Sequence, residues 1–153
     1  MSHPFLSGNF GPVDGELTEL DLDVTGQIPR ELEGRLLRIG PNPINADPNT
    51  YHWFLGNGMA HGVKIRDGKA EWYRRRFVRD DETTEAFGWP PVETPTRDED
   101  EMRIGGGIAN TNIIGHAGTT LAIVEAGNYP VELTEELETI RRTDFGGTLP
   151  GGF

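Results

Sequence analysis

Hydrophobic and polar positions alternate along much of this chain at the period of a β-strand. The clearest stretch holds three strand-like runs, Tyr51–Leu55, Met59–Arg66 and Lys69–Val78, which are separated by Asn57-Gly58 and Asp67-Gly68. Asn-Gly and Asp-Gly favour type I′ turns, because both central residues need a positive φ and the twist of that turn suits antiparallel strands. The pattern therefore predicts a three-stranded antiparallel meander over residues 51–78.

Two further strand-like runs precede this meander. Leu17–Val24 carries apolar side chains at alternate positions, and Arg35–Ile39 leads into Gly40–Pro43, whose prolines cannot remain in a central strand. Between them, Ile28–Leu32 has a proline near its start and predicts a short helical turn. Residues 1–14 are polar with Gly and Pro, and we expect them to form a flexible lead-in.

A second β unit is predicted near the end of the chain. Ile108–His116 and Thr119–Ala126 flank Ala117-Gly118, and the shorter runs Tyr129–Leu133 and Glu138–Phe145 follow. Four short antiparallel strands within about forty residues are typical of one blade of a β-propeller.

The segment Asp80–Arg103, between the two β units, is rich in acidic residues and proline. It predicts a long solvated connection with one helical turn. A metal-binding carboxylate cluster is the weaker interpretation, because the spacing lacks the central glycine of an EF-hand loop.

The composition supports an all-β fold. The chain has 153 residues, about one domain, is 35% hydrophobic, and contains 21 Gly and 11 Pro. Many short strands joined by tight turns fit this composition better than a helix bundle does.

Charge and cysteine content exclude several functional classes. The formal net charge is −11, so the surface repels the phosphates of nucleic acids and anionic membranes. The absence of cysteine excludes disulfides, zinc–thiolate sites and thiol nucleophiles. No apolar run approaches the roughly 20 residues that span a bilayer, and the first residues lack the pattern of a signal peptide. We therefore expect a cytoplasmic protein.

Four histidines are candidate metal ligands: His3, His52, His61 and His116. A metal site needs three or four ligands around one ion. His52 and His61 fall on neighbouring predicted strands across Asn57-Gly58, but no third ligand lies near them in the sequence. The expected role of these histidines is packing and hydrogen bonding.

Glu125 follows the apolar run 121–124 and precedes Ala126-Gly127. A carboxylate at the end of a buried strand has to be paired, because burial without a partner is costly. Two interpretations remain at this point: Glu125 is exposed at the strand end, or it orients a metal-bound histidine.

Several segments, in this order, resemble the N-terminal part of the carotenoid cleavage oxygenases: LEGRLLRIGPNP, YHWFLGNGMAHGVKIRDGKAEWYRRRFVR, GGGIANTNIIGHAGTTLAIVEAGNYPVEL and LETIRRTDFGGTLPGGF. This family includes carotenoid, apocarotenoid and lignostilbene dioxygenases and the retinal pigment epithelium isomerase. The resemblance covers residues 15–153, and several segments in the same order are more specific than any single motif.

The resemblance implies a seven-bladed β-propeller with a non-haem Fe(II) held by four histidines, most of them supported by glutamates. Such an enzyme uses O₂ to cleave a double bond of an apolar polyene or stilbene substrate. Residues 15–153 would then be the N-terminal part of one incomplete propeller domain. The resemblance leaves the oligomeric state, peripheral membrane association and the choice between cleavage and isomerisation open.

One site residue is carried over from the family. Glu125 matches the family's first glutamate that supports an iron ligand, in a Glu-Ala-Gly context. None of the four histidines matches an iron ligand of the family, whose first iron-binding histidine would come shortly after Phe153. The resemblance therefore implies no metal ligand in this chain, and we expect residues 1–153 alone to be inactive.

A second hypothesis is a short, non-catalytic β-propeller-like binding module, or a degenerate fragment, without iron. Partial propellers can complete a ring by self-association. A hydrolytic propeller such as a lactonase is a third and weaker alternative, because it needs clustered acidic metal ligands.

Overall fold

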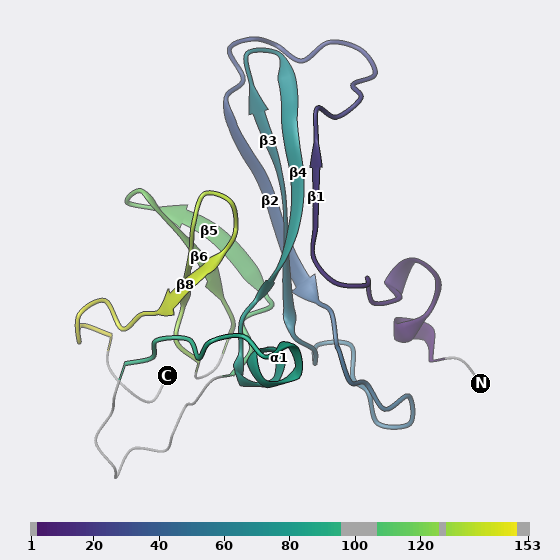
Figure 1. Ribbon diagram of the computed structural model, residues 1–153, viewed down its shortest axis with the longest axis vertical. Helices are drawn as coiled ribbons and strands as arrows, with labels where there is room; N and C mark the ends of the chain where they lie inside the picture. Colours follow the sequence, from purple (N-terminus) through teal and green to yellow (C-terminus); the bar gives the residue numbers. More distant parts are fainter. Residues whose placement is uncertain (1–2, 96–106, 126–127, 150–153) are drawn as a thin grey trace.

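The computed structural model describes residues 3–95, 107–125 and 128–149, and its strands form two four-stranded antiparallel sheets (Figure 1). The first sheet has the strand order β1-β4-β3-β2 and the second the order β5-β6-β7-β8. The strands are β1 (Leu17–Leu20), β2 (Gly34–Pro41), β3 (Gly58–Arg66), β4 (Lys69–Val78), β5 (Asn112–His116), β6 (Thr119–Ile123), β7 (Val131–Leu133) and β8 (Thr139–Arg142).

Helices are few in the described ranges. They comprise the α-helix α1 (Asp81–Phe87) and the 3₁₀ helices η1 (Pro4–Leu6) and η2 (Gly8–Phe10). The structure is thus mostly β-sheet, as predicted, with one α-helix where the sequence predicted a helical turn. No helix in these ranges has the length and hydrophobicity needed to cross a bilayer.

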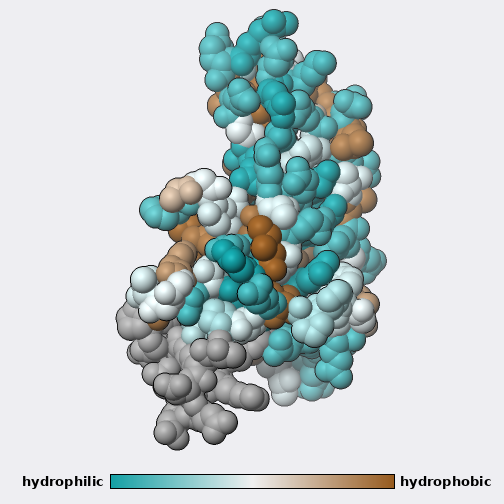
Figure 2. Space-filling model, turned by 60° about the vertical axis from the view of Figure 1, so that its left-hand side comes forward, coloured by the Kyte–Doolittle hydropathy of each residue, from teal (hydrophilic) through white to brown (hydrophobic). Residues whose placement is uncertain are grey.

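One of the two predicted turns of the meander is confirmed. Asp67-Gly68 joins β3 to β4, and both residues have the positive φ of a type I′ turn, 49° and 74°. The upper end of the first sheet, around this turn, is covered mainly by hydrophilic side chains (Figure 2).

The prediction for Asn57-Gly58 is wrong. Tyr51–Leu55 forms turns, and the other neighbour of β3 is β2. Asn57 lacks the positive φ that a type I′ turn needs. Its side chain is buried and makes hydrogen bonds to residues that are distant in the sequence. Its amide nitrogen donates to Asp80 (3.0 Å) and Glu82 (2.9 Å), and its Oδ1 accepts from the backbone of Ile44 (3.1 Å).

Gly58, at the start of β3, lies close to the segment that leads into the second sheet. A Cβ added at this glycine would overlap the carbonyl oxygen of Ala109, in the segment that leads into β5. The glycine therefore permits a close backbone approach between the sheets, not a turn.

The second sheet confirms the predicted four-stranded antiparallel unit. Ala117 and Gly118 have φ values of 47° and 79° and connect β5 to β6. The strands are shorter than predicted: β5 begins at Asn112 and β6 ends at Ile123, so Glu125 lies just beyond the sheet.

One hydrophobic core joins the two sheets. Its buried members come from both sheets and from the segments beside them: Ala60, Val78, Ala109, Ala122, Val131, Leu133 and Leu137. Leu37 and Ile39 of β2 pack against this cluster from the first sheet. Burial of this apolar surface is the main force that holds the sheets together.

Polar contacts also cross between the sheets. Arg76 on β4 pairs with Glu138 at 2.6 Å, and Lys64 on β3 pairs with Glu135 at 2.6 Å. Arg142 on β8 has a fully buried guanidinium group, and burial lowers its pKa. It donates to Thr94 and to the carbonyl of Arg79, which ties the segments on either side of α1 to the second sheet.

The connection between the sheets is not only a solvated loop. Asp80 caps α1: its carboxylate accepts from the backbone and hydroxyl of Thr83 (2.8 and 2.9 Å). Glu93 forms a parallel bridge with Arg141 of β8. The part of the predicted connection from residue 96 to residue 103 lies outside the described residues.

The N-terminal segment packs on the first sheet. Asn42 accepts from the backbone of Val13 (2.7 Å) and donates back to its carbonyl (3.2 Å). Phe5 and Phe10 stack edgewise on Trp53, with ring centroids 4.7 and 5.4 Å apart. The predicted flexibility of residues 1–14, and the boundary at residue 15, stay predictions.

Candidate functional site

Glu125 lies at the open end of the β5–β6 hairpin, opposite the Ala117-Gly118 turn, and its side chain is exposed. The hydroxyl of Thr111 donates to its Oε2 at 2.6 Å. This hydrogen bond, followed by one from the backbone N–H of Glu125 itself, lowers the pKa of the carboxyl group. Glu125 is therefore a fixed, ionised hydrogen-bond acceptor at neutral pH.

Thr111 is held in place by its own backbone and by its neighbour. Its N–H donates to the carbonyl of Ile123 (3.1 Å), which extends the β5–β6 ladder by one bond. The adjacent Asn110 is buried and donates to the carbonyls of Phe54 (3.1 Å) and Gly56 (2.9 Å). The loop before β3 thus fixes the residue that holds Glu125.

The sequence analysis missed both Thr111 and Asn110. A signal was available: the hairpin register pairs Asn112 with Ile123, so continuing it outward brings residue 111 close to Glu125. The predicted strands Ile108–His116 and Thr119–Ala126 hid this end of the hairpin, because residues 110 and 111 were treated as ordinary strand positions.

The four histidines do not form a common site. His116 ends β5 at the Ala117-Gly118 turn, at the other end of the hairpin from Glu125. His3 and His52 each accept a hydrogen bond from a backbone N–H two residues later, those of Phe5 and Phe54. His52 is not in a strand, so the prediction that it neighbours His61 across a hairpin is wrong.

His61 is the histidine with the most perturbed environment. It sits on β3, half-buried, with its Nδ1 2.8 Å from the hydroxyl of Tyr73. Burial, followed by the positive charges of Arg38 and Arg75, lowers its pKa to about 4. The ring is therefore neutral at physiological pH.

A metal site is not assembled by this part of the protein. Within residues 3–95, 107–125 and 128–149, no group of three or more His, Asp or Glu side chains is placed to hold an ion. The described residues therefore do not fit an iron centre by themselves. Glu125 fits a different task, which is to accept the N–H of a metal-bound imidazole.

Comparison with known proteins identifies the family. The profile described as retinal pigment epithelial membrane protein matches residues 10–153. The chain belongs to the carotenoid cleavage oxygenase family. A carotenoid cleavage oxygenase of Mycobacterium tuberculosis is 51% identical over 152 residues, which are 99% of this chain and 30% of that protein.

Solved structures agree with this membership. Lignostilbene dioxygenase of Pseudomonas brassicacearum superposes with a TM-score of 0.75 and 29% identity, over 94% of this chain and 31% of that one. Synechocystis apocarotenoid oxygenase, solved as a variant with aspartate in place of a glutamate, superposes with a TM-score of 0.71 and 29% identity. The match covers 92% of this chain and 32% of that one. The same oxygenase has been solved with cobalt substituted, so it has a metal site. The chain spans about a third of the length of these relatives.

Proposed function

We propose that this chain supplies the N-terminal blades of a seven-bladed β-propeller enzyme. That enzyme is an Fe(II)-dependent dioxygenase that uses O₂ to cleave a C=C double bond of a carotenoid, apocarotenoid or stilbene-type substrate. The relatives named above support the reaction class, because they are oxygenases of carotenoids, apocarotenoids and lignostilbenes.

The observation that carries the proposal is the ionised carboxylate of Glu125, held by Thr111 at the end of the second sheet. In the proposed enzyme, Glu125 accepts a hydrogen bond from the imidazole of an iron-binding histidine that lies outside residues 1–153. This bond orients the ring and makes its other nitrogen a better ligand. The bound iron supplies the place where O₂ is activated.

The neighbouring oxygenase gives independent support for the Thr111–Glu125 pair. Structures of Synechocystis apocarotenoid oxygenase have been solved with a substituted glutamate and with a substituted threonine, and these two positions are 14 residues apart. Thr111 and Glu125 have the same separation. A threonine hydroxyl that donates to the glutamate keeps it ionised and leaves its second oxygen for the imidazole N–H.

A hybrid protein tests the proposal directly. Residues 1–153 replace the corresponding 30% of the Mycobacterium tuberculosis oxygenase, with which they share 51% identity. The hybrid should retain iron and cleave an apocarotenoid or stilbene substrate. E125Q in this hybrid should weaken iron retention by about 10–100-fold, because glutamine is a poorer acceptor for the histidine N–H.

The matched control is E85Q. Glu85 is an exposed glutamate on α1, so its replacement should leave iron content and turnover unchanged. Iron is measured by mass spectrometry after dialysis, and cleavage by chromatography of the carbonyl products. An E125Q hybrid with normal iron content and turnover would remove the role assigned to Glu125.

The isolated chain gives a second test. Residues 1–153, loaded with Fe(II), should retain no stoichiometric iron and release no cleavage products. A monomer that binds one iron tightly would contradict the proposal. A defined oligomer that unfolds sharply, combined with an inactive hybrid, would instead favour the non-catalytic binding module.

A further inference from the structure

Asn110 is a buried amide that contacts both the first sheet's loop before β3 and the residue that holds Glu125. Its side chain belongs to a residue that is 4% exposed, and its Nδ2 donates to the carbonyls of Phe54 (3.1 Å) and Gly56 (2.9 Å). Its Oδ1 lies 3.2 Å from the hydroxyl of Thr111. Both polar atoms of this side chain therefore have partners, and residues of this chain supply all of them.

These contacts fix the orientation of the Asn110 amide. The atom that faces two carbonyl oxygens has to be the nitrogen, so the atom that faces Thr111 is Oδ1. The Thr111 hydroxyl has one hydrogen and two acceptors, the Glu125 carboxylate at 2.6 Å and Asn110 Oδ1 at 3.2 Å. The nearer, charged acceptor takes the hydrogen, and Oδ1 is a second and weaker acceptor that keeps the hydroxyl in this position.

The loop that carries the two carbonyls is itself held by the first sheet. Gly56 has a φ of 134°, and a Cβ there would lie 3.0 Å from Pro43 and 3.2 Å from Pro41 at the end of β2. The carbonyl of Asn57, the next residue, accepts from the N–H of Asn42 (2.7 Å). The loop is thus packed against the end of β2 and hydrogen-bonded to it where it meets Asn110.

Thr111 needs such support, because strand pairing holds it only weakly. It lies one residue before the start of β5, and a single backbone hydrogen bond to Ile123 continues the ladder at this position. Glu125 is exposed and lies beyond the end of β6, so the sheet does not fix its side chain. The path from the loop carbonyls through Asn110 and Thr111 to Glu125 supplies this constraint.

We propose that Asn110 is a positioning residue for Glu125: through Thr111, it lets the first sheet set where the Glu125 carboxylate points. The inference rests on the proposed function in one respect, because this position matters to the reaction only if Glu125 orients an iron-binding histidine. Metal affinity falls when such a supporting contact is lost. The first sheet then contributes to iron binding without providing a ligand.

The position of Glu125 is measurable in the 153-residue chain without any metal. Three-bond couplings in NMR spectra report whether the χ1 angles of Thr111 and Glu125 keep one rotamer or average over three. We expect one dominant rotamer for both side chains in the native chain. N110A and T111V should each give averaged couplings at Glu125, like those of the exposed Glu85 on α1.

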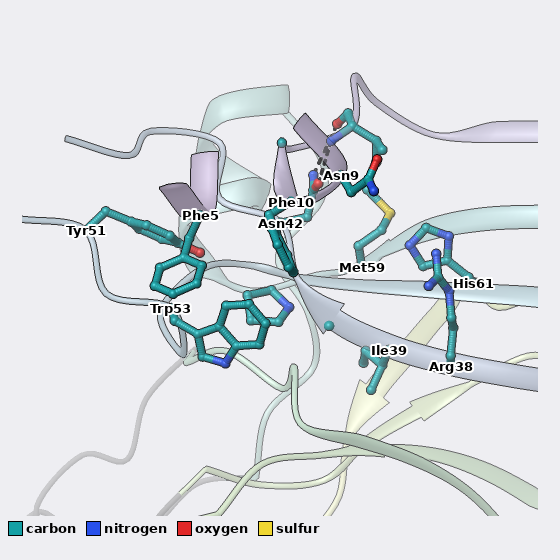
Figure 3. A pocket seen from close by; sticks show the side chains of 14 residues that line it. Phe5, Asn9, Phe10, Arg38, Ile39, Asn42, Tyr51, Trp53, Met59 and His61 are labelled. Atoms are coloured by element: carbon teal, nitrogen blue, oxygen red, sulfur yellow. Dashed lines mark hydrogen bonds between the residues drawn. The ribbon is translucent and has the colours of Figure 1, made fainter. Parts of the chain in front are cut away.

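Asn42 offers a matched control. It is also a buried asparagine, 5% exposed, and its side chain binds backbone groups, the N–H and the carbonyl of Val13 (Figure 3). N42A should lower stability as N110A does, yet leave the Thr111 and Glu125 couplings unchanged. Averaged couplings in N42A, or native couplings in N110A, would overturn the proposal. Circular dichroism verifies folding, and N110S, which keeps a polar group at the position, replaces N110A if that variant does not fold.

A double-mutant cycle in the hybrid oxygenase separates positioning from general destabilisation. If Asn110 acts through Glu125, N110A should lower iron affinity about tenfold, and should have no further effect once E125Q is present. Equal losses in the two backgrounds would contradict the inference. Failure of E125Q alone to weaken iron binding would instead remove the proposed role of Glu125, and the NMR couplings would still decide whether Asn110 positions its carboxylate.

Discussion

The first sheet has two faces with opposite character. The face toward the second sheet is closed: Leu37 and Ile39 pack into the shared core, and Gly58 allows the backbones to touch. The opposite face, which carries Leu36 and Arg38 and which we call the outer face, is not covered by the residues that the structure describes: Arg38 is unpaired among them, and Leu36 is 70% exposed. Within the described residues, the packing of the first sheet is thus concentrated in the seam between the two sheets, and the outer face contributes less to it.

The polar groups of the two faces differ in the same way. Asn57, at the edge of the seam, is 1% exposed and has hydrogen bonds at both its side-chain nitrogen and its oxygen. His61, on the outer face, has one side-chain partner, Tyr73. A saturated buried amide is typical of a structural role, and a half-buried ring with one partner contributes less to stability.

Replacement of Asn57 should give the largest effect. N57L leaves the partly buried backbone N–H of Ile44 without its acceptor and the Asp80 carboxylate without one of its donors. We expect a loss of about 3 kcal/mol in the free energy of unfolding, measured by urea denaturation. N9A is the control, because Asn9 is exposed; it should change stability by less than about 0.5 kcal/mol. Equal effects of the two variants would mean that the seam is no more ordered than the outer face.

Overpacking of the seam between the sheets should give the second-largest loss of stability. In G58A, the new methyl group meets the Ala109 carbonyl, and the sheets have to move apart. We expect a loss of about 2 kcal/mol. G115A on β5 is matched, because a Cβ there has nothing within 4 Å, and it should be close to neutral. A neutral G58A would show that the two sheets are not in the close contact described above.

The smallest effect should come from the outer face, as a change in how the free energy of unfolding depends on pH. The pKa of His61 falls from an ordinary value of 6.5 to about 4 on folding. The unfolded chain therefore binds more protons than the folded chain between these values, and the contribution of His61 to stability is lost as pH falls from about 6.5 toward 4. His61 is only half-buried, so we expect less than about 1 kcal/mol. Urea midpoints at pH 7 and pH 5 should differ less in H61Q than in the native chain; an identical difference would contradict the shift.

Prediction from the sequence succeeded where contacts are local. Asp67-Gly68 specifies its turn through backbone preference, Gly118 readily adopts the positive φ of the turn that it shares with Ala117, and both turns are present. The sequence failed at Asn57-Gly58, although this dipeptide has a similar turn preference. Asn57 makes hydrogen bonds with Asp80 and Glu82, more than twenty residues away, and these bonds override the local preference.

The candidate site shows the same limit. Glu125 was predicted as a site residue from its position after an apolar strand and from the resemblance of its surroundings to the carotenoid cleavage oxygenases, and its role stays a prediction. Thr111 and Asn110 were not found, because their roles depend on the exact end of β5 and on the loop at Phe54–Gly56.

The sequence by itself determined the β-rich class, the hairpin turns, the acidic charge and the resemblance to an oxygenase family, since each depends on residue type or on neighbours along the chain. The tertiary structure alone decided which polar groups are buried and satisfied, where the two sheets touch, and that Asn110 and Thr111 connect the loop before β3 to Glu125. These features join residues that are far apart in the chain, and the alternation of hydrophobic and polar positions gives each strand two faces without specifying what either face contacts.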